Sequence, residues 1–260
     1  APPMGIASIK GSVLKAGYTA KCFDLNIDLY HAVTFDTWLE LDSYFQTDLR
    51  YTGTSLNGAG SREINFINIV QKRKKELHCY KEYNDFLEKA IHDILAHEPE
   101  WIGVSVFSVN SVISIVNFLS ILKEIKPDQK VMAGGMGLSS FGLGGNSNFG
   151  EFLIEQGLIT TYISGEGELA IIDLLKEGKE SKFTPQINDL NSLAFPNYDD
   201  FDLSLYPGKE NMVYITGSRG CVRACTFCDI NSLWKKFRYR SGDNIAQEIL
   251  EGHKKYNTTD

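Results

Sequence analysis

Apolar residues recur at helical spacing near the start of the chain, over residues 6–17, and Gly17 would end that helix. Residues 20–27 then form a run that is typical of a strand. An α/β fold is wound from strand to helix to strand, so a chain that opens with a helix lacks the strand before it. We therefore expect the first strand of the sheet to be missing.

The next long segment, residues 30–97, is predicted to be mostly helical and shows no strand pattern. Residues 51–61 within it are rich in Gly, Ser, Thr and Asn and predict a loop. Its clearest feature is an apolar stripe along one helix face, formed by Tyr83, Phe86, Leu87, Ala90, Ile91, Ile94 and Leu95. We interpret the segment as a helical insertion in an α/β domain.

Strand and helix patterns alternate regularly after residue 100. Apolar runs predict strands at residues 101–107, 130–133 and 160–164, and periodicity predicts helices at residues 112–125, 149–156 and 167–176. Residues 134–150 hold seven glycines in seventeen residues, so this backbone can approach a ligand closely. The alternation predicts a Rossmann-like, doubly wound parallel sheet.

Residues 178–211 break this pattern, because three prolines punctuate a polar stretch that we interpret as a linker. A second unit then begins with a strand at residues 212–216. It continues through a cysteine-rich loop to a helix at residues 243–256. The predicted domains are therefore residues 1–177, the linker, and residues 212–260.

The overall composition is that of an ordinary soluble globular protein. The 260 residues are 43% hydrophobic and 23% charged, which excludes collagen-like, low-complexity and disordered classes. No apolar run is long enough to span a membrane and no signal peptide is visible, so we expect a cytoplasmic protein without a membrane partner. The formal net charge of −7 argues against a general nucleic-acid binder.

Three of the five cysteines, Cys221, Cys225 and Cys228, lie within eight residues just after the strand predicted for the second unit. The other two, Cys22 and Cys79, are isolated and are interpreted as small core residues. In a reducing compartment, clustered thiols indicate metal or redox chemistry. The C-x3-C-x2-C spacing can supply three thiolates to three irons of a cubane cluster. The fourth iron would then be open to a substrate or cofactor.

Other interpretations of this loop stay open. A structural zinc site would need a fourth ligand, for which the only nearby candidate is His253. The stretch from Arg219 to Arg240 carries six basic residues and one acid, a net charge of +5. Such a charge would favour thiolate formation by the cysteines, or would provide an RNA-binding surface.

The motif Gly-Ser-Arg-Gly followed by C-x3-C-x-φ-C, with an aromatic residue before the last cysteine, resembles the radical S-adenosylmethionine (SAM) superfamily. The resemblance implies a 4Fe-4S cluster held by Cys221, Cys225 and Cys228. It also implies S-adenosylmethionine bound at the fourth iron and cleaved reductively to a 5′-deoxyadenosyl radical, with Phe227 packed near the adenine. A TIM-type (βα) barrel and an electron donor such as flavodoxin or ferredoxin are further implications.

Four features of the first half together resemble the cobalamin-binding domain often found ahead of radical SAM cores: Pro2-Pro3-Met4-Gly5, Ala16-Gly17-Tyr18, a Ser-x-hydrophobic…Gly-Gly pair, and Gly165-Glu166-Gly167-Glu168. The resemblance implies cofactor-binding roles for Ser105, Phe107, Ser108, Gly134, Gly135, Gly165 and Glu166. The Asp-x-His-x-x-Gly motif that would carry a histidine ligand to cobalt does not occur. We therefore name no axial ligand, and a domain that keeps this fold without binding cobalamin is an alternative.

Residues 165–170, Gly-Glu-Gly-Glu-Leu-Ala, also fit the glycine pattern of nicotinamide-binding sites. Such a site would need this pattern on the first strand, with an acid about 20 residues further on. Here it follows a late strand, so a tight turn with a helix N-terminus facing a ligand is the preferred interpretation.

The combined pattern predicts a radical SAM enzyme with an N-terminal cobalamin-binding domain. We expect methyl transfer to an unactivated carbon or related radical chemistry such as ring rearrangement, on a substrate that the sequence does not specify. The alternatives are a radical SAM RNA-modifying enzyme with a degenerate cobalamin domain, and a non-catalytic metal-binding or redox-sensing module. Only 32 residues follow Cys228, so we expect the first βα unit of a truncated barrel and no turnover by this chain alone.

Overall fold

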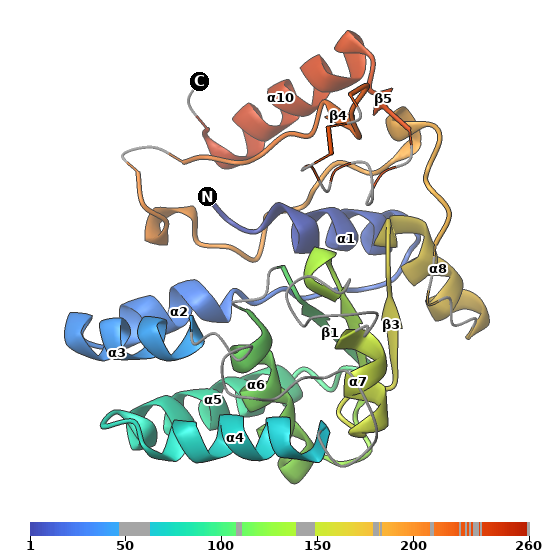
Figure 1. The fold of residues 1–260 in the computed structure, drawn as a ribbon. Coiled ribbons are helices and arrows are strands. Elements are labelled where there is room, and N and C mark those ends of the chain that lie inside the picture. The colour runs from blue at the N-terminus through green and yellow to red at the C-terminus, as the bar shows by residue number, and fades with distance from the viewer. Residues whose placement is uncertain are drawn as a thin grey trace. The chain divides into compact units, whose positions relative to one another are not determined.

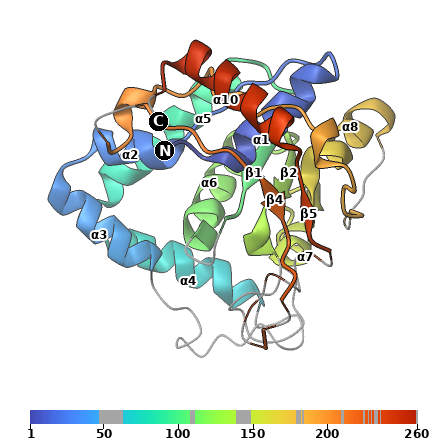
Figure 2. The ribbon, with the colours of Figure 1, turned by 90° about the horizontal axis from the view of Figure 1, so that it is seen from above.

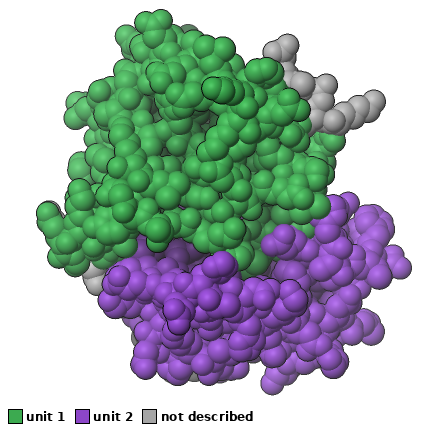
Figure 3. All heavy atoms as spheres, turned by 180° about the vertical axis from the view of Figure 1, so that it is seen from behind, with its two compact units in different colours: residues 1–27, 165–260 green, residues 28–164 purple. Residues whose placement is uncertain are grey.

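The computed structural model describes residues 1–46, 63–107, 111–138, 149–178, 184–208, 211–223 and 236–258, together with residues 182, 225, 226, 228, 230 and 234. The chain divides into two compact units, coloured separately in Figure 3. The sheet unit is Asp28–Ser164, and the cysteine unit is Ala1–Ile27 with Gly165–Asp260. The division into domains that the sequence predicts, with boundaries at residues 177 and 211, is a functional one and stays a prediction.

Three parallel strands form the described sheet of the sheet unit, in the order β1-β2-β3. The elements in chain order are β1 (Trp101–Ser105), α6 (Ser111–Ile125), β2 (Lys130–Gly134), α7 (Phe149–Glu155) and β3 (Thr161–Ile163). Ser105 pairs with Gly134, and Gly134 with Ile163. The predicted strand–helix alternation and parallel winding are confirmed, while the cobalamin-binding type of the fold stays a prediction.

Helices make up the regular structure of the other described parts of the sheet unit. They are α2 (Leu25–Ala32, which starts in the cysteine unit), α3 (Phe35–Phe45), α4 (Glu63–Lys75) and α5 (Tyr80–Leu95). Helices α3, α4 and α5 all contact α6, and the predicted apolar stripe is buried at Tyr83, Leu87, Ile91 and Ile94. The loop predicted at residues 51–61 lies outside the described residues. No helix that the structure describes has both the length and the apolar character needed to cross a bilayer.

The cysteine unit combines helices with one short antiparallel strand pair. Its elements are α1 (Met4–Lys15), α8 (Gly167–Glu177), the 3-10 turns η3 (Leu190–Ser192) and η4 (Leu203–Leu205), β4 (Ser218–Arg219), β5 (Arg238–Tyr239) and α10 (Gly242–Tyr256). Helices α1 and α8 contact each other, and β4 lies beside β5 (Figures 1 and 2). The helices predicted at residues 6–17, 167–176 and 243–256 are confirmed.

The predicted linker packs closely against the rest of the cysteine unit. Tyr198 and Phe201 are buried in a small core with Ala7 of α1. A Cβ atom on Gly11 would overlap the carbonyl oxygen of Phe195, so glycine allows the chain to approach α1 this closely. The proline-punctuated stretch is therefore an integral part of this unit.

The strand predicted at residues 20–27 is wrong. The Cys22 N–H donates to Asp200 Oδ2 at 2.7 Å, and Asp24 Oδ1 accepts from the Asn26 N–H at 3.2 Å where α2 begins. Carboxylates, instead of a neighbouring strand, satisfy these backbone donors.

The strand predicted at residues 212–216 is also wrong. Met212 and Tyr214 are exposed while the residues between and after them are half-buried, which is the alternation of a strand. Among the described residues, however, no partner pairs with this stretch, and the ladder starts only at Ser218. The predicted βα unit is therefore replaced by an antiparallel pair followed by α10.

Candidate functional site in the cysteine loop and at the sheet edge

The three clustered cysteines lie on the connection from β4 to β5, residues 220–237, which we call the cysteine loop. Cys221 and Cys225 are exposed and Cys228 is half-buried. The Cys228 N–H donates to the Cys225 carbonyl at 3.2 Å, which forms a tight turn between the second and third thiols. Phe227, expected near the adenine, lies outside the described residues. The described part of the loop therefore presents its thiols where an external group can reach them.

The two ends of the cysteine loop are in close backbone contact. Arg219 lies opposite Arg238 in the β4–β5 pair. Gly220, the first residue of the loop, has a φ of +85°, and a Cβ on it would overlap the carbonyl of Lys236 near the other end. Glycine is required here both by the left-handed backbone and by the close approach.

A buried carboxylate links both strands. Glu166 Oε1 accepts from Arg219 Nη1 at 3.0 Å, and its Oε2 accepts from Arg238 Nη1 at 2.7 Å. Arg219 also pairs with Glu168 of α8, and Glu166 Oε2 accepts the Ile187 N–H. Burial acts to raise the pKa of Glu166, but the hydrogen bonds from Arg238, Ile187 and Arg219 outweigh it and hold the pKa below its ordinary value. Both carboxylate oxygens of Glu166 thus already have partners within the chain. The cofactor-binding role expected for Glu166 stays a prediction.

This pairing corrects the expected charge of the cysteine loop. Glu166 pairs with both Arg219 and Arg238, and Glu168 pairs with Arg219 alone. Arg240 forms an ion pair with Glu248 of α10. Three of the six basic residues counted in the sequence are therefore offset by three acids. These arginines add little net positive charge that could act on the thiols or on RNA.

Sequence reasoning missed Glu168, Arg238 and Glu248 as parts of this arrangement. The partners of Arg219 and Arg238 lie 51 and 72 residues away in the sequence, beyond the reach of any local periodicity. The Gly-Glu-Gly-Glu pattern gives no signal for these partners, because the helix dipole already favours acids near a helix start.

The three thiols of the cysteine loop are donors that a metal site could use. Among the described residues, no three His, Cys, Asp or Glu side chains converge on a position for one metal ion. A structural zinc site needs such convergence, whereas in a cubane cluster each thiolate ligates a different iron. His253, the candidate fourth zinc ligand, is exposed on α10 with its Nδ1 near the Thr258 carbonyl. Both the cluster and the zinc interpretation of the three thiols therefore stay predictions.

The second group of predicted residues lies at the carboxyl edge of the sheet. Ser105, at the end of β1, is opposite Gly134 at the end of β2, and the Val106 N–H extends the ladder to the Gly134 carbonyl at 2.7 Å. Phe107, two residues beyond Ser105, is 75% exposed. The structure thus brings Ser105, Phe107 and Gly134 to the edge where open parallel sheets bind ligands. Ser108 lies outside the described residues, as do residues 139–148 of the glycine-rich segment.

Two of the glycines expected to face a ligand are also required by the fold. Gly135 has a φ of +107°, and a Cβ on it would lie 2.5 Å from the Val106 carbonyl oxygen. Gly165 has a φ of +108°, and a Cβ there would lie 2.7 Å from Thr184 Oγ1. Gly134 differs, because the nearest atom to its Cβ position is 3.9 Å away. No described neighbour therefore requires glycine at position 134, and the binding roles of all three glycines stay predictions.

The two isolated cysteines differ from the loop cysteines in their surroundings. Cys79 is buried, and Cys22 is half-buried against the Ala7 core. Burial raises the pKa of Cys22 to about 11, and burial together with Glu40 raises that of Cys79 to about 12. Both therefore fit the interpretation as small packing residues.

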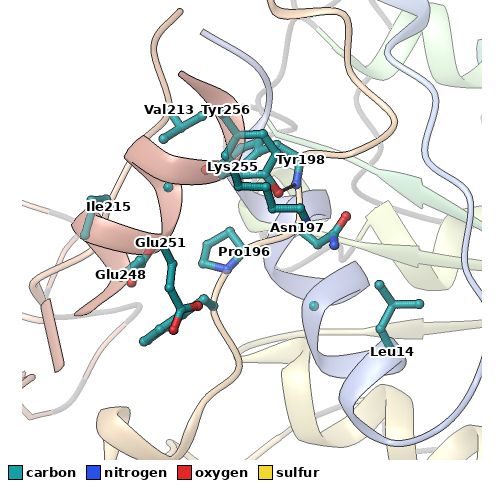
Figure 4. A pocket seen from close by; sticks show the side chains of 13 residues that line it. Leu14, Pro196, Asn197, Tyr198, Val213, Ile215, Glu248, Glu251, Lys255 and Tyr256 are labelled. Carbon is teal, nitrogen blue, oxygen red and sulfur yellow. Dashed lines mark hydrogen bonds between the residues drawn. The ribbon is translucent and has the colours of Figure 1, made fainter. Parts of the chain in front are cut away.

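A cleft of about 210 Å³ occurs in the cysteine unit, away from the predicted site residues. Figure 4 shows Pro196 between Leu14 of α1 and Glu248 and Glu251 of α10. No cysteine and none of the residues predicted to bind a cofactor lines it. The cleft therefore adds nothing to the candidate site.

Comparison with known proteins gives two distant relatives. No protein-family model and no solved structure matches the chain. The chain is 22% identical over 193 residues to the anaerobic magnesium-protoporphyrin IX monomethyl ester cyclase of Rubrivivax gelatinosus, and 24% identical over 190 residues to that of Synechocystis sp.. These matches cover 64% and 63% of this chain but 33% and 36% of the cyclases, so the chain spans about a third of the length of the curated relatives. The similarity supports a distant relationship to these enzymes.

Proposed function

We propose that this chain holds a 4Fe-4S cluster on Cys221, Cys225 and Cys228 and is part of a radical SAM enzyme. The observation that carries the proposal is the C-x3-C-x2-C cysteine loop, whose thiols are accessible while its ends are fixed. The similarity to two anaerobic cyclases supports an enzyme of this class. The chain spans about a third of those proteins, so reaction, substrate and partners are proposed for the whole protein.

The three cysteines would each ligate one iron as thiolates and leave the fourth iron to S-adenosylmethionine. When bound, a cluster reduced by a donor such as flavodoxin or ferredoxin would supply one electron to the sulfonium of S-adenosylmethionine, which would give methionine and a 5′-deoxyadenosyl radical. The chain itself must present three thiolates on one surface loop and keep the ends of that loop together. Gly220 serves the second requirement, because it lets the Lys236 backbone approach.

We further propose that the sheet edge formed by Ser105, Phe107 and Gly134 receives a corrinoid. The Ser105 hydroxyl can donate or accept a hydrogen bond, and the exposed ring of Phe107 offers an apolar surface. Gly134 has no side chain, so a ligand could come close to its backbone. The cofactor-binding roles expected for Ser108, Gly135, Gly165 and Glu166 stay predictions.

For the reaction, we propose radical chemistry at an unactivated carbon, with ring formation ranked beside methyl transfer because both relatives are named as cyclases. The RNA-modifying alternative loses much of its support, since three of the six basic residues near the cysteines are paired with glutamates. A non-catalytic metal-binding module stays the contrasting outcome.

The test is anaerobic reconstitution of the chain with iron and sulfide. We expect cluster formation, and an electron paramagnetic resonance (EPR) spectrum of the reduced cluster that changes when S-adenosylmethionine is added. Alanine at Cys221, Cys225 or Cys228 should prevent this, and alanine at Cys22 or Cys79 should not. A cluster that ignores S-adenosylmethionine would favour the non-catalytic module, and equal iron loading in all five variants would refute the ligand assignment.

A further inference from the structure

The ladder that closes the cysteine loop is too short to hold it closed. Strands β4 and β5 have two residues each, whereas independently stable sheets need longer and more numerous strands. Closing a loop of this length also carries an entropic cost, against which the ladder sets two residue pairs and a hydrogen bond from the Arg240 N–H to the Gly217 carbonyl at 2.9 Å. Some other interaction must therefore keep the two ends together.

The side chains that meet across this ladder make the problem worse. Arg219 and Arg238 are directly opposite each other, and like charges at such positions repel. Arg238 is 7% exposed and Arg219 is 16% exposed, so water screens this repulsion weakly. Without an acid between them, the two arginines would push the ends of the cysteine loop apart.

Glu166 provides the missing interaction. Its Oε1 holds the arginine just before the loop and its Oε2 holds the arginine just after it, at 3.0 and 2.7 Å. The side chain is 4% exposed, and the Ile187 N–H fixes the same carboxylate. A single rigid carboxylate thus bridges both ends of the segment that carries Cys221, Cys225 and Cys228.

We propose that Glu166 is a positioning residue for the cysteine loop: by clamping Arg219 and Arg238 together, it keeps the three thiols close enough to share one cluster. Only the cluster part of this inference rests on the proposed function. The clamp is a property of the metal-free chain and is measurable without iron. Residues that orient metal ligands typically change metal retention about 10-fold or more when they are replaced.

The test compares Glu166→Gln with a matched control, Asp200→Asn. Asp200 is a largely buried carboxylate of the same unit, with an 11% exposed side chain, that also pairs with two cations, Lys10 and Lys21, and accepts one backbone N–H. Replacing it should destabilise the unit to a similar extent without touching the cysteine loop. Gly220→Ala is a second, uncharged variant, because its Cβ would force the loop ends apart.

The first measurement is hydrogen exchange of residues 217–240 in the metal-free chain. Glu166→Gln and Gly220→Ala should accelerate exchange in this segment selectively, and Asp200→Asn should not. The second measurement is iron retained after anaerobic reconstitution, together with the EPR line shape of the remaining cluster. Both loop variants should retain about 10-fold less iron and broaden the spectrum, while Asp200→Asn should match the unmodified chain.

The outcomes separate the clamp from the proposed function. Unchanged exchange in Glu166→Gln, or equal changes in Asp200→Asn, would overturn the clamp whatever the metal content. Normal iron retention in a Glu166→Gln chain whose loop exchanges faster would overturn its role in positioning the thiols. If the unmodified chain binds no iron, the proposed function fails, and selective exchange in the loop variants would still support the clamp.

Discussion

Arg219 and Arg238 lie directly opposite each other in the β4–β5 pair, and the carboxylate of Glu166 binds both guanidinium groups. Glu168 also pairs with Arg219, so the buried group contains two arginines and two glutamates. Removing one member of a buried ion pair typically costs about 3–5 kcal/mol. The region around the cysteine loop therefore depends on an acid that lies more than 50 residues earlier in the sequence.

The first prediction concerns the acid stability of the cysteine unit. The pKa values of Glu166 and Asp200 lie below the ordinary 4.5 and 3.8, because bonds from arginines, lysines and backbone N–H groups outweigh burial. A lowered pKa in the folded state stabilises the fold above the ordinary pKa, and this contribution is lost as the pH falls through the folded value. Urea midpoints should therefore fall steadily below about pH 4.5.

The variant Glu166→Gln provides the check on this pH dependence. It should be less stable than the unmodified chain at neutral pH, and its stability should change less between about pH 5 and pH 3. If the stabilities of the two proteins fall in parallel as the pH is lowered, the pKa of Glu166 is not lowered in the folded state.

The second prediction concerns the reactivity of the five cysteines in the metal-free chain. Cys221 and Cys225 are exposed and should be alkylated first, followed by the half-buried Cys228. Cys22 and Cys79 should react only on unfolding, because their pKa values are raised to about 11 and about 12 and the thiolate is the reactive form. Mass spectrometry of timed iodoacetamide reactions at about pH 8 measures this order. Early modification of Cys79 would contradict the burial described here.

Local sequence patterns predicted the sheet unit well, and the reason is physical. Apolar runs and helical stripes such as the one containing Tyr83 and Ile91 report burial within a few turns of the chain, which is what β1, β2 and α5 require. The position of Ser105 beside Gly134 also follows from the strand pattern, because the carboxyl ends of parallel strands lie at one edge of the sheet.

The failures share one cause, which is pairing over long sequence separations. Residues 20–27 look like a strand, yet Asp200, 178 residues from Cys22, takes the backbone N–H that a strand partner would take. Arg219 looks like a free positive charge until Glu166 and Glu168 are placed beside it. Neither partner can be identified from periodicity, because charge pairing leaves no repeating pattern in the chain.

The third prediction concerns a buried polar network in the helical part of the sheet unit. Asn117, fully buried, donates to Tyr44 Oη at 3.0 Å, and Tyr44 donates to the Val70 carbonyl at 3.0 Å. Tyr44→Phe would leave the Asn117 amide and the Val70 carbonyl without this partner. Each buried group left unsatisfied lowers the free energy of unfolding by about 1–3 kcal/mol. Urea unfolding should show this loss. The control Tyr30→Phe, at an exposed tyrosine of α2, should change the free energy of unfolding by no more than about 0.5 kcal/mol.

The double variant Tyr44→Phe with Asn117→Leu sharpens that test. Replacing both partners removes the unsatisfied donor of Asn117, so the combined loss should be smaller than the sum of the two single losses. Strict additivity would mean that the two side chains do not act as one network.

The last prediction concerns corrinoid retention at the sheet edge. Phe107 is 75% exposed, so Phe107→Ala should change the free energy of unfolding by no more than about 0.5 kcal/mol. If its ring packs on a bound corrinoid, the lost contact is worth about 0.5–1.5 kcal/mol, which is about a two- to tenfold weaker retention. Visible spectra after incubation with hydroxocobalamin and gel filtration measure the retained corrinoid. Leu39→Ala on α3 is the matched control, since Leu39 is also apolar and exposed, at 50%, but lies on a helix far from β1 in the sequence. Equal retention by both variants would remove Phe107 from the site, and no retention by the unmodified chain would favour a domain that keeps the α/β fold without the cofactor.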